Sequence, residues 1–391
     1  MIGFIIRRLL SGLVVLFGVV LFVFVLARVI PGDPCVAAHG EKATPQVCAD
    51  FNHRYGLDKP VPIQFGIYLG VLNADADGAA MLFTESGFPA FYFLPEILGG
   101  GSTGLIHGDL DESLRFGRPV TDIIVERLPV TLELTFFALL FATVVGIPLG
   151  ILSAVRRGSK TDVGTMVGAN LGVSIPVFVL GLFLQLVFAV WLKDTFLSLP
   201  PSGRVSAGAT PDSLAEVWGL DGLEGFPATV LMFISNMYVI NAILTLNGEL
   251  FVDATRHLIL PALAVGTIPL AIIARMTRSS LLEVLGLDYI RTARAKGLRE
   301  QLVVVRHGLR TALLPVVTVM GLSLGAFLAG AVLTETIFGL AGIGKTIIDA
   351  VQGRDYIVIQ GVTIVVAAAY VIVNLVVDVS YAYLDPRVRL T

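Results

Sequence analysis

The stretch that decides the fold is Leu134 to Val155, LTFFALLFATVVGIPLGILSAV, in which no side chain carries a charge. An α-helix rises about 1.5 Å per residue, so about 20 apolar residues cross the roughly 30 Å hydrocarbon core of a bilayer. A charge at the bilayer centre costs about 3 kcal/mol or more. A charge-free run of this length therefore predicts a transmembrane helix.

Five further stretches pass the same test: Leu9 to Ala27, Val163 to Leu192, Leu258 to Ala274, Thr311 to Thr334 and Tyr356 to Val377. Of the 391 residues, 55% are hydrophobic and only 15% are charged, against about 25% charged in a typical soluble domain. We therefore expect an all-α membrane protein with six transmembrane helices.

A seventh charge-free stretch, Gly225 to Gly248, is also long enough to span. Basic residues collect on the cytoplasmic side of a membrane protein. Two spans between Lys160 and Arg275 keep all the basic clusters on one side, whereas three would place the densest cluster outside. We expect 225–248 to be a periplasmic or re-entrant helix, and both termini to be cytoplasmic. The basic clusters are Arg7 and Arg8, Arg156 to Lys160, Arg275 to Arg310, and Arg387 with Arg389.

The predicted organisation has three parts. The first is the N-terminus with the first span, the second is a large periplasmic loop with a Gly, Ala and Asp-rich insertion, and the third is a core of five spans. Their ranges are 1–30, 31–127 with the insertion near 73–101, and 128–391, which includes a periplasmic segment at 193–256 and a cytoplasmic loop at 275–310.

The cytoplasmic loop contains a predicted two-turn helix from Asp288 to Gly297. Asp288 suits an N-cap, and Gly297 suits the left-handed residue that ends a helix. So short a helix is unstable alone in water and needs a partner surface, which Ala293 and Ala295 would let approach closely. An ordinary positive-inside loop is the alternative. The charges at its rim are Arg291, Arg294, Lys296 and Arg299.

Motifs along nearly the whole chain resemble the inner-membrane permeases of dipeptide and oligopeptide ABC importers. The order and spacing of these motifs carry the resemblance more than any single one. They are Arg7-Arg-Leu-Leu10, Pro31-Gly-Asp-Pro34, Tyr55 to Pro60 with Gln64, Pro129 to Leu134, Ser174 to Phe178, Arg275 to Glu283, Asp288 to Gly297, Arg306 to Pro315, Arg354-Asp-Tyr356, Asp378 and Asp385-Pro-Arg387.

The resemblance implies a type I ABC importer permease fold and a set of partners. These are a second homologous permease, two cytoplasmic ATPases that carry the ATP and Mg²⁺, and an extracytoplasmic substrate-binding protein. This chain would bind no cofactor and catalyse no reaction. The resemblance also implies that the ATPase docks on a coupling helix formed by Asp288, Tyr289, Arg291, Ala293, Arg294, Ala295, Lys296, Gly297 and Leu298.

The sequence departs from the general importer signature in this loop. That signature begins Glu-Ala-Ala six residues before its glycine, whereas this chain has Arg291-Thr292-Ala293. The peptide branch commonly shows this variant, so a docking role carries over and a contact through that glutamate does not.

The segment Gly339-Leu-Ala-Gly-Ile-Gly-Lys-Thr346 satisfies the letter of the phosphate-binding pattern G-x-x-x-x-G-K-T. That pattern works only where a strand enters the loop and a helix leaves it. Here the preceding element is a predicted span, and the loop faces outside, so we expect no nucleotide site.

Only two cysteines occur, Cys35 and Cys48, and both fall on the predicted outside. An oxidising periplasm permits a disulfide between them, and free thiols are the alternative. Together with His39 and His53 they fit no common zinc spacing, so we predict no metal site.

Polar side chains within the predicted spans are candidates for the translocation path. Such groups usually face the interior of a helix bundle, where they equally serve as contacts between helices. The candidates are Ser174, Gln185, Thr318, Ser323 and Asn374.

Two competing classes are a self-contained secondary carrier or channel, and a membrane-bound enzyme. Carriers and channels usually need intramembrane charges or a filter sequence, and the centres of the six spans hold no charge. No catalytic set of side chains supports an enzyme. Members of the resembling family move dipeptides, longer peptides, nickel complexes or sugars, so the sequence leaves the substrate open.

Overall fold

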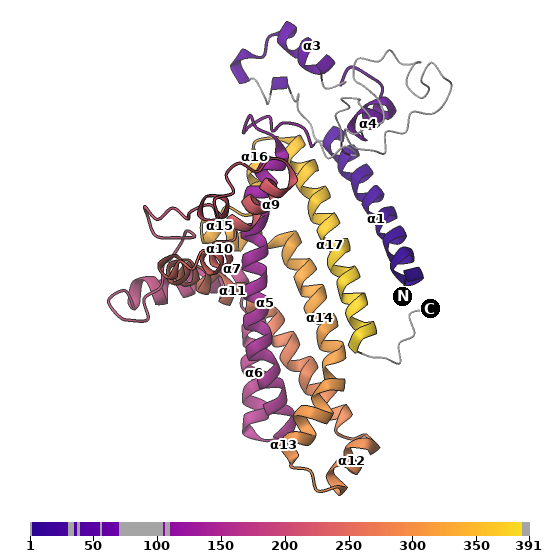
Figure 1. The fold of residues 1–391 in the computed structure, drawn as a ribbon, viewed down its shortest axis with the longest axis vertical. Helices are drawn as coiled ribbons and strands as arrows, with labels where there is room; N and C mark the ends of the chain where they lie inside the picture. Colours follow the sequence, from indigo (N-terminus) through magenta and orange to yellow (C-terminus); the bar gives the residue numbers. More distant parts are fainter. Residues whose placement is uncertain are drawn as a thin grey trace. The chain divides into compact units, whose positions relative to one another are not determined.

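The fold is given by a computed structural model, which describes residues 2–29, 35–36, 40–54, 57–69, 105 and 110–384 (Figure 1). The insertion expected near 73–101 lies outside these residues. The chain forms two compact units. Unit 1 comprises Met1–Ser11, Glu126–Lys345 and Ala368–Thr391, and unit 2 comprises Gly12–Val125 and Thr346–Ala367.

Among the described residues, five continuous helices are long and apolar enough to cross a membrane. Four of them cover a predicted span in full, whereas the span predicted over 311–334 is too long at its end, because its helix stops at Gly330 and a separate short helix follows from Val332. The four helices that cover their predicted spans are longer than the charge-free stretches because their ends extend into polar sequence. Asn247, for example, caps the first turn of α11 by accepting a bond from the Leu250 N–H at 3.0 Å. The five are α1 (Ile2–Val29), α5 (Val120–Val155), α11 (Gly248–Val284), α14 (Leu309–Gly330) and α17 (Tyr356–Leu384).

The remaining predicted span, 163–192, is not straight. It consists of α6 (Lys160–Ser174) followed by α7 (Val177–Gln185) and a π-helical turn η4 (Leu186–Trp191), with a bend of 98° between the two halves. The break falls at Ile175, whose ψ of 123° is extended. A residue before proline is pushed out of the helical region, and Pro176 follows here.

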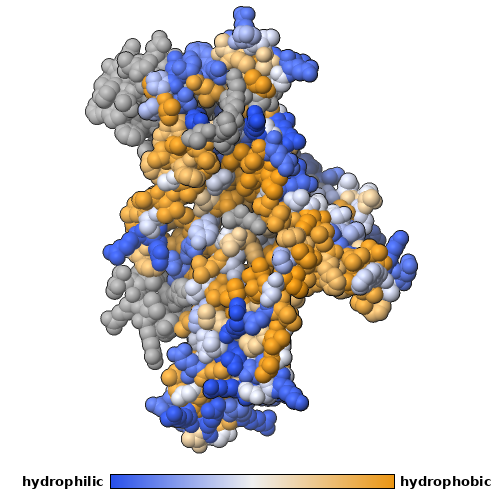
Figure 2. Space-filling view, turned by 180° about the vertical axis from the view of Figure 1, so that it is seen from behind, coloured by the Kyte–Doolittle hydropathy of each residue, from blue (hydrophilic) through white to orange (hydrophobic). Residues whose placement is uncertain are grey.

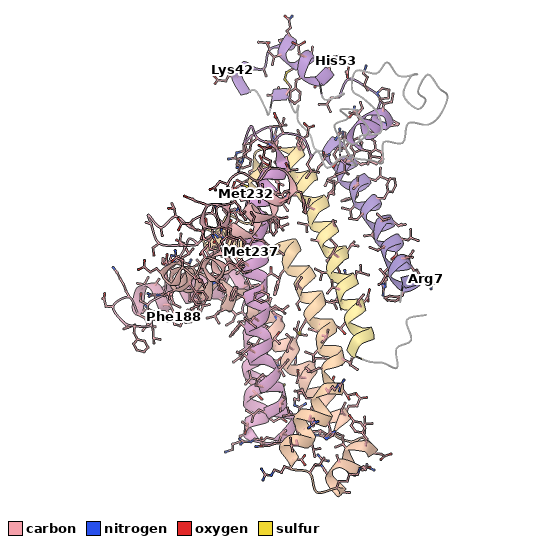
Figure 3. The ribbon with its side chains drawn as sticks, viewed as in Figure 1. Arg7, Lys42, His53, Phe188, Met232 and Met237 are labelled. Atoms are coloured by element: carbon pink, nitrogen blue, oxygen red, sulfur yellow. A yellow bond between two sulfur atoms is a disulfide. The ribbon has the colours of Figure 1, made fainter. Side chains whose placement is uncertain are left out.

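The stretch 225–248, expected to be periplasmic or re-entrant, is a second bent pair. Helices α9 (Phe226–Ser235) and α10 (Tyr238–Leu244) meet at 105°. Met232 of α9 and Met237 in the turn after it lie near one another on one side of unit 1 (Figure 3). With each bent pair counted as one span, the candidate spans among the described residues number up to seven.

Helices α5 and α11 form the centre of unit 1. Their backbones approach so closely at glycines that a Cβ added at Gly150 would lie 2.6 Å from the Ala274 carbonyl oxygen, and one at Gly266 would lie 2.7 Å from the Ala138 carbonyl oxygen. Small residues permit this kind of packing between helices in a membrane. The contact fixes α5 and α11 against each other.

Shorter elements complete unit 1. After α14 the chain forms α15 (Val332–Ile337), a turn in which Phe338 is 1% exposed, and the start of α16 (Ile343–Gln352). The other short elements are α8 (Leu214–Val217), α12 (Asp288–Ala295), α13 (Glu300–Leu302) and a π-helical turn η5 (Val303–Gly308).

Unit 2 holds the described part of the large loop. It contains η1 (Gly40–Lys42), α3 (Pro45–Arg54) and α4 (Val61–Leu69), whose Phe65 ring lies 5.0 Å from that of Phe24 in α1. Cys35 and Cys48 form a disulfide, on the segment where Figure 3 labels Lys42 and His53. The buried Asp355 carboxylate accepts a bond from the Ser113 hydroxyl at 2.5 Å.

Candidate functional site

The predicted coupling helix is present as α12, directly after α11. It begins one residue away from the prediction: Leu287 is the N-cap, and Asp288 is the first helical residue. Leu287 has no side-chain acceptor, so no side chain caps the helix. The Asp288 carboxylate instead lies 3.2 Å from the Arg291 guanidinium, one turn further on. The expectation that Asp288 caps the helix was wrong because the chain turns one residue earlier.

One face of α12 packs on its own chain. Ile290 is fully buried and Ala293 is 7% exposed, both in a cluster that also includes Leu281 and Val284 of α11. The expectation that Ala293 admits a partner was therefore wrong, because that methyl group already contacts this chain. Burial of apolar surface stabilises a fold by about 25 cal/mol per Å². The buried face therefore holds this short helix in place, although it would be unstable alone.

The opposite face of α12 is open. Ala295 is exposed, as are the other predicted coupling residues Asp288, Tyr289, Arg291, Arg294, Lys296, Gly297 and Leu298. Within unit 1, α12 and α13 lie at the end away from α9, α10 and α15 (Figure 1). Figure 2 shows hydrophilic residues gathered at that same end.

Two contacts fix the shape of the loop around α12. The Tyr289 hydroxyl donates towards the Thr311 hydroxyl at 3.3 Å, at the start of α14. The Arg294 guanidinium binds both carboxylate oxygens of Glu300, at 3.1 and 2.7 Å, and this bond holds the pKa of the Glu300 carboxyl below its usual range. Paired contacts of this kind fix orientation as well as distance.

Gly297 ends the helix as predicted. Its φ of +76° lies in the left-handed region, and the C-cap is Lys296. A Cβ added at Gly297 would meet no atom within 4 Å, so the glycine is required for backbone conformation and not for lack of space.

The translocation-path candidates bond mostly within their own helices. Four of them bond a carbonyl four residues earlier in their own helix, which is the usual fate of a polar side chain in an apolar helix. Gln185 differs: its Nε2 donates to the Pro201 carbonyl at 2.6 Å and to the Ile337 carbonyl at 3.2 Å, so it ties the 193–256 segment to α15. The other four are Ser174, Thr318, Ser323 and Asn374.

The phosphate-loop match has a helix at its end, α16, but its donors are already used. Glu335, fully buried, accepts bonds from the Lys345 N–H at 2.9 Å and from the Thr131 hydroxyl at 2.6 Å. A Cβ at Gly342 would lie 2.4 Å from the Glu335 carboxylate. An internal carboxylate thus lies against the turn that a phosphate would need, and no strand enters this turn.

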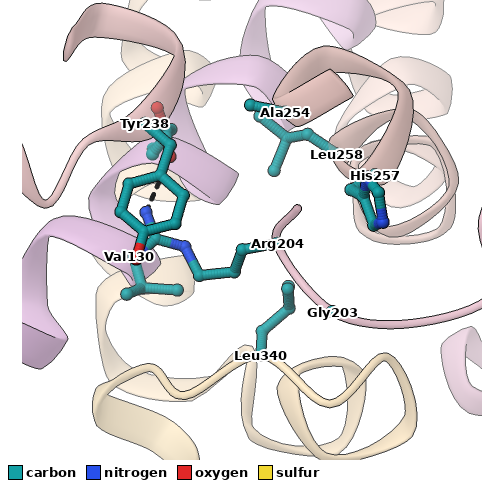
Figure 4. A pocket seen from close by; sticks show the side chains of 9 residues that line it. Val130, Gly203, Arg204, Tyr238, Ala254, His257, Leu258 and Leu340 are labelled. Atoms are coloured by element: carbon teal, nitrogen blue, oxygen red, sulfur yellow. Dashed lines mark hydrogen bonds and ion pairs between the residues drawn. The ribbon is translucent and has the colours of Figure 1, made fainter. Parts of the chain in front are cut away.

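A pocket in unit 1 is lined by a buried ion pair that the sequence analysis missed (Figure 4). Arg204 Nη2 lies 3.2 Å from Glu133 Oε2, and the guanidinium lies 3.5 Å from the centre of the Tyr238 ring. Burial lowers the pKa of Arg204, and Glu133 opposes that shift. The pair attaches the 193–256 segment to α5. The sequence signal was that Arg204 is the only Lys or Arg between Lys193 and Arg256.

A second ion pair that sequence reasoning missed lies near α12. Arg278 of α11 binds both carboxylate oxygens of Asp162 in α6, with the Nε at 2.7 Å. Both residues flank predicted spans, but sequence alone does not show which charges meet. Among the residues that the structure describes, no three His, Cys, Asp or Glu side chains gather in a way that could hold a metal ion.

Two family models match the chain. Residues 146–390 match the family described as binding-protein-dependent transport system inner membrane component, and residues 1–89 match the N-terminal family of such membrane components.

Similar proteins match along nearly their whole length. The chain is 43% identical to the dipeptide transport system permease protein DppB of Escherichia coli K12 and 42% identical to the di/tripeptide transport system permease protein DppB of Pseudomonas aeruginosa, with 100% of this chain and 99% of each relative covered. It is 38% identical to the probable D,D-dipeptide transport system permease protein DdpB of Escherichia coli K12, over 98% of this chain and 97% of that protein. The chain belongs to the family of binding-protein-dependent transport system inner membrane components and is a multi-pass inner-membrane permease.

Proposed function

We propose that this chain is one of two permease subunits that enclose the path of an ATP-driven importer of dipeptides or short oligopeptides. The full-length similarity to dipeptide and di/tripeptide permeases supports the substrate class. The matches to these two relatives cover 100% of the chain, so the proposal concerns the whole chain and not one part of it.

The observation that carries the proposal is the construction of α12. Its apolar face is fixed on α11 through Ile290 and Ala293, while its charged face is open at the hydrophilic end of unit 1. A short helix that is packed against its own chain on one side and exposed on the other suits docking of a second protein. We propose that the partner is a cytoplasmic ATPase and that both termini lie on the same side as α12.

In this mechanism the chain itself hydrolyses nothing and binds no ATP or Mg²⁺. Two ATPase subunits hold the nucleotide, and their closure pushes on α12 and on the matching helix of a second, homologous permease. An extracytoplasmic binding protein delivers the peptide. The permease must exchange between two conformations during this cycle. A partner can shift the equilibrium between them only through contacts that differ between the two conformations, and α12 supplies those contacts.

The direct test is purification of the chain with its partners, followed by reconstitution into vesicles. We expect two ATPase subunits to co-purify, and a labelled dipeptide to accumulate only with ATP and binding protein present. Uptake driven by an ion gradient without ATP would instead support a self-contained carrier. Uptake of a nickel complex or a sugar but no peptide would support the proposed importer mechanism but contradict the proposed peptide substrate.

A further inference from the structure

One carboxylate joins three elements at the end of unit 1 that holds α12. Asp162, in the first turn of α6, is 4% exposed and accepts bonds from Nε and Nη2 of Arg278 on α11, at 2.7 and 2.8 Å. It also accepts bonds from the Ser153 hydroxyl at the end of α5 and from the Gly158 N–H at 2.9 Å in the turn between α5 and α6. All of these donors converge on a single side chain.

The arginine of this pair stands close to α12 along the chain. Arg278 lies on α11 ten residues before Asp288. Between them, Leu281 and Val284 pack in one buried cluster with Ile290 and Ala293 of α12. A displacement of α12 therefore acts on the part of α11 that carries Arg278.

Asp162, the carboxylate of this ion pair, lies in the first turn of α6, where the two bent helices α6 and α7 begin. From Asp162, α6 runs to the break at Ile175, and α7 follows at 98°. Through Gln185, the end of α7 reaches the carbonyl oxygens of Pro201 and Ile337. Asp162 is thus at one end of an element whose other end contacts the 193–256 segment and α15.

Helices α6 and α11 are in extensive contact, but no glycine of α6 approaches α11 as closely as Gly150 of α5 does. At Gly150 of α5 an added Cβ would lie 2.6 Å from the backbone of α11. At Gly164 and Gly168 of α6 an added Cβ would meet nothing within 4 Å, and at Gly172 the nearest atom would be a Thr267 carbon at 3.8 Å. The bidentate bond to Arg278 adds a directional link to this packing, at the first turn of α6.

We propose that the Asp162–Arg278 ion pair is a positioning contact that carries the movement of α12 to the bent pair of α6 and α7. The proposal rests on the proposed function, since it assumes that an ATPase docks on α12. Breaking the pair would let α12 move without moving α6, so ATP would be hydrolysed with less peptide transported.

The experiment uses the reconstituted complex with Asp162→Asn, Arg278→Gln and the double variant. The readout is the number of dipeptides transported per ATP hydrolysed, normalised to assembled complex. We expect each single variant to lower this ratio several-fold and the double variant to be no worse than either, because partners in one contact are not additive. Arg8→Gln is the matched control: it breaks the Arg8–Asp378 ion pair between α1 and α17 and should leave the ratio unchanged.

An unchanged ratio in both single variants would overturn the inference, as would multiplying losses in the double variant or an equal loss in Arg8→Gln. Variants that only lower the amount of complex, with a normal ratio for each assembled complex, would also overturn it. If Asp162→Asn fails to assemble, Arg278→Gln, at a side chain 28% exposed, carries the test alone. If the wild-type complex transports without hydrolysing ATP, the proposed function itself fails.

Discussion

The Glu335 carboxylate accepts a hydrogen bond from the backbone N–H of Lys345 at 2.9 Å, in the first turn of α16. A helix N-terminus presents free N–H groups that attract an anion. In this chain the anion is a side chain of the protein. The segment Gly339 to Thr346 matches the phosphate-binding pattern in sequence, but the helix that follows it is already capped by Glu335.

Replacing Glu335 with Ala should therefore destabilise the protein without affecting nucleotide binding. The Thr131 hydroxyl and the Lys345 N–H would lose their acceptor, and a buried unsatisfied polar group costs about 1–3 kcal/mol. Thermal unfolding of the purified chain measures the loss. Lys345→Met is the control, since a phosphate loop depends on this lysine and a capped helix does not. Loss of ATP-driven transport in Lys345→Met at normal stability would contradict this interpretation.

The spans could be predicted from sequence because they depend on the composition of a continuous stretch of chain and not on which residues meet in space. A charge-free run long enough to cross a bilayer is visible without knowing any contact, and four of the six predicted runs lie wholly within continuous helices. A fifth, 311–334, is helical up to Gly330 and ends in the separate helix α15. The dipeptide Ile175-Pro176 favours a break in the helix at Ile175, but the sequence does not show that the two halves meet at 98°.

Pairings between distant side chains could not be predicted. Asp162 meets Arg278 across 116 positions, and Glu133 meets Arg204 across 71. The pattern of charges along the sequence shows which residues are acidic and which are basic, but it does not show which helix faces meet. The same limit explains Ala293: a small residue in a short helix suits contact with a partner or with its own chain, and here the cluster with Leu281 decides for the latter.

A substitution at Gly297 should uncouple ATP hydrolysis from transport while the protein still inserts. The φ of +76° is unfavourable for a residue with a branched Cβ, at a cost of about 1–3 kcal/mol, so Gly297→Val should shift the backbone after α12. Gly297→Asn should lose less, because asparagine tolerates the left-handed region. The measurement is dipeptide uptake and ATPase activity of the same preparation. Equal defects in both variants would point to a surface contact at this position instead of backbone strain.

The loop around α12 should loosen at acid pH. The pKa of Glu300 is lowered by its bond to Arg294 from an ordinary value of 4.5, so the pair stabilises the loop above that pH and is lost as the pH falls through the lowered pKa. Hydrogen exchange of the α12 amides, corrected for intrinsic rates, should rise in that window. Glu300→Gln should show fast exchange at every pH. A pH dependence that survives in Glu300→Gln would assign the effect to another group.

The disulfide between Cys35 and Cys48 should protect the segment that contains α3. A cross-link that closes a loop of this size is worth about 3 kcal/mol through the unfolded state. Cys35→Ser should therefore speed protease cleavage within residues 40–54, and Cys48→Ser should match it. If the two single variants and the double variant are cleaved at the wild-type rate, the bond does not hold this segment.

Close packing of α5 on α11 predicts opposite results at two glycines. In Gly150→Ala the new methyl group would lie 2.6 Å from both the Ala274 carbonyl oxygen and the Thr277 Cβ, so the helices must separate. Overpacking of this kind costs about 1–3 kcal/mol. Gly164→Ala adds the same atom on α6 where nothing lies within 4 Å, and it should be neutral or stabilising, since alanine favours a helix. Melting temperatures of the two variants in one detergent compare them directly. Because α11 leads into α12, Gly150→Ala should also lower transport per ATP, and a destabilised variant with normal coupling would show that α5 takes no part in passing movement along.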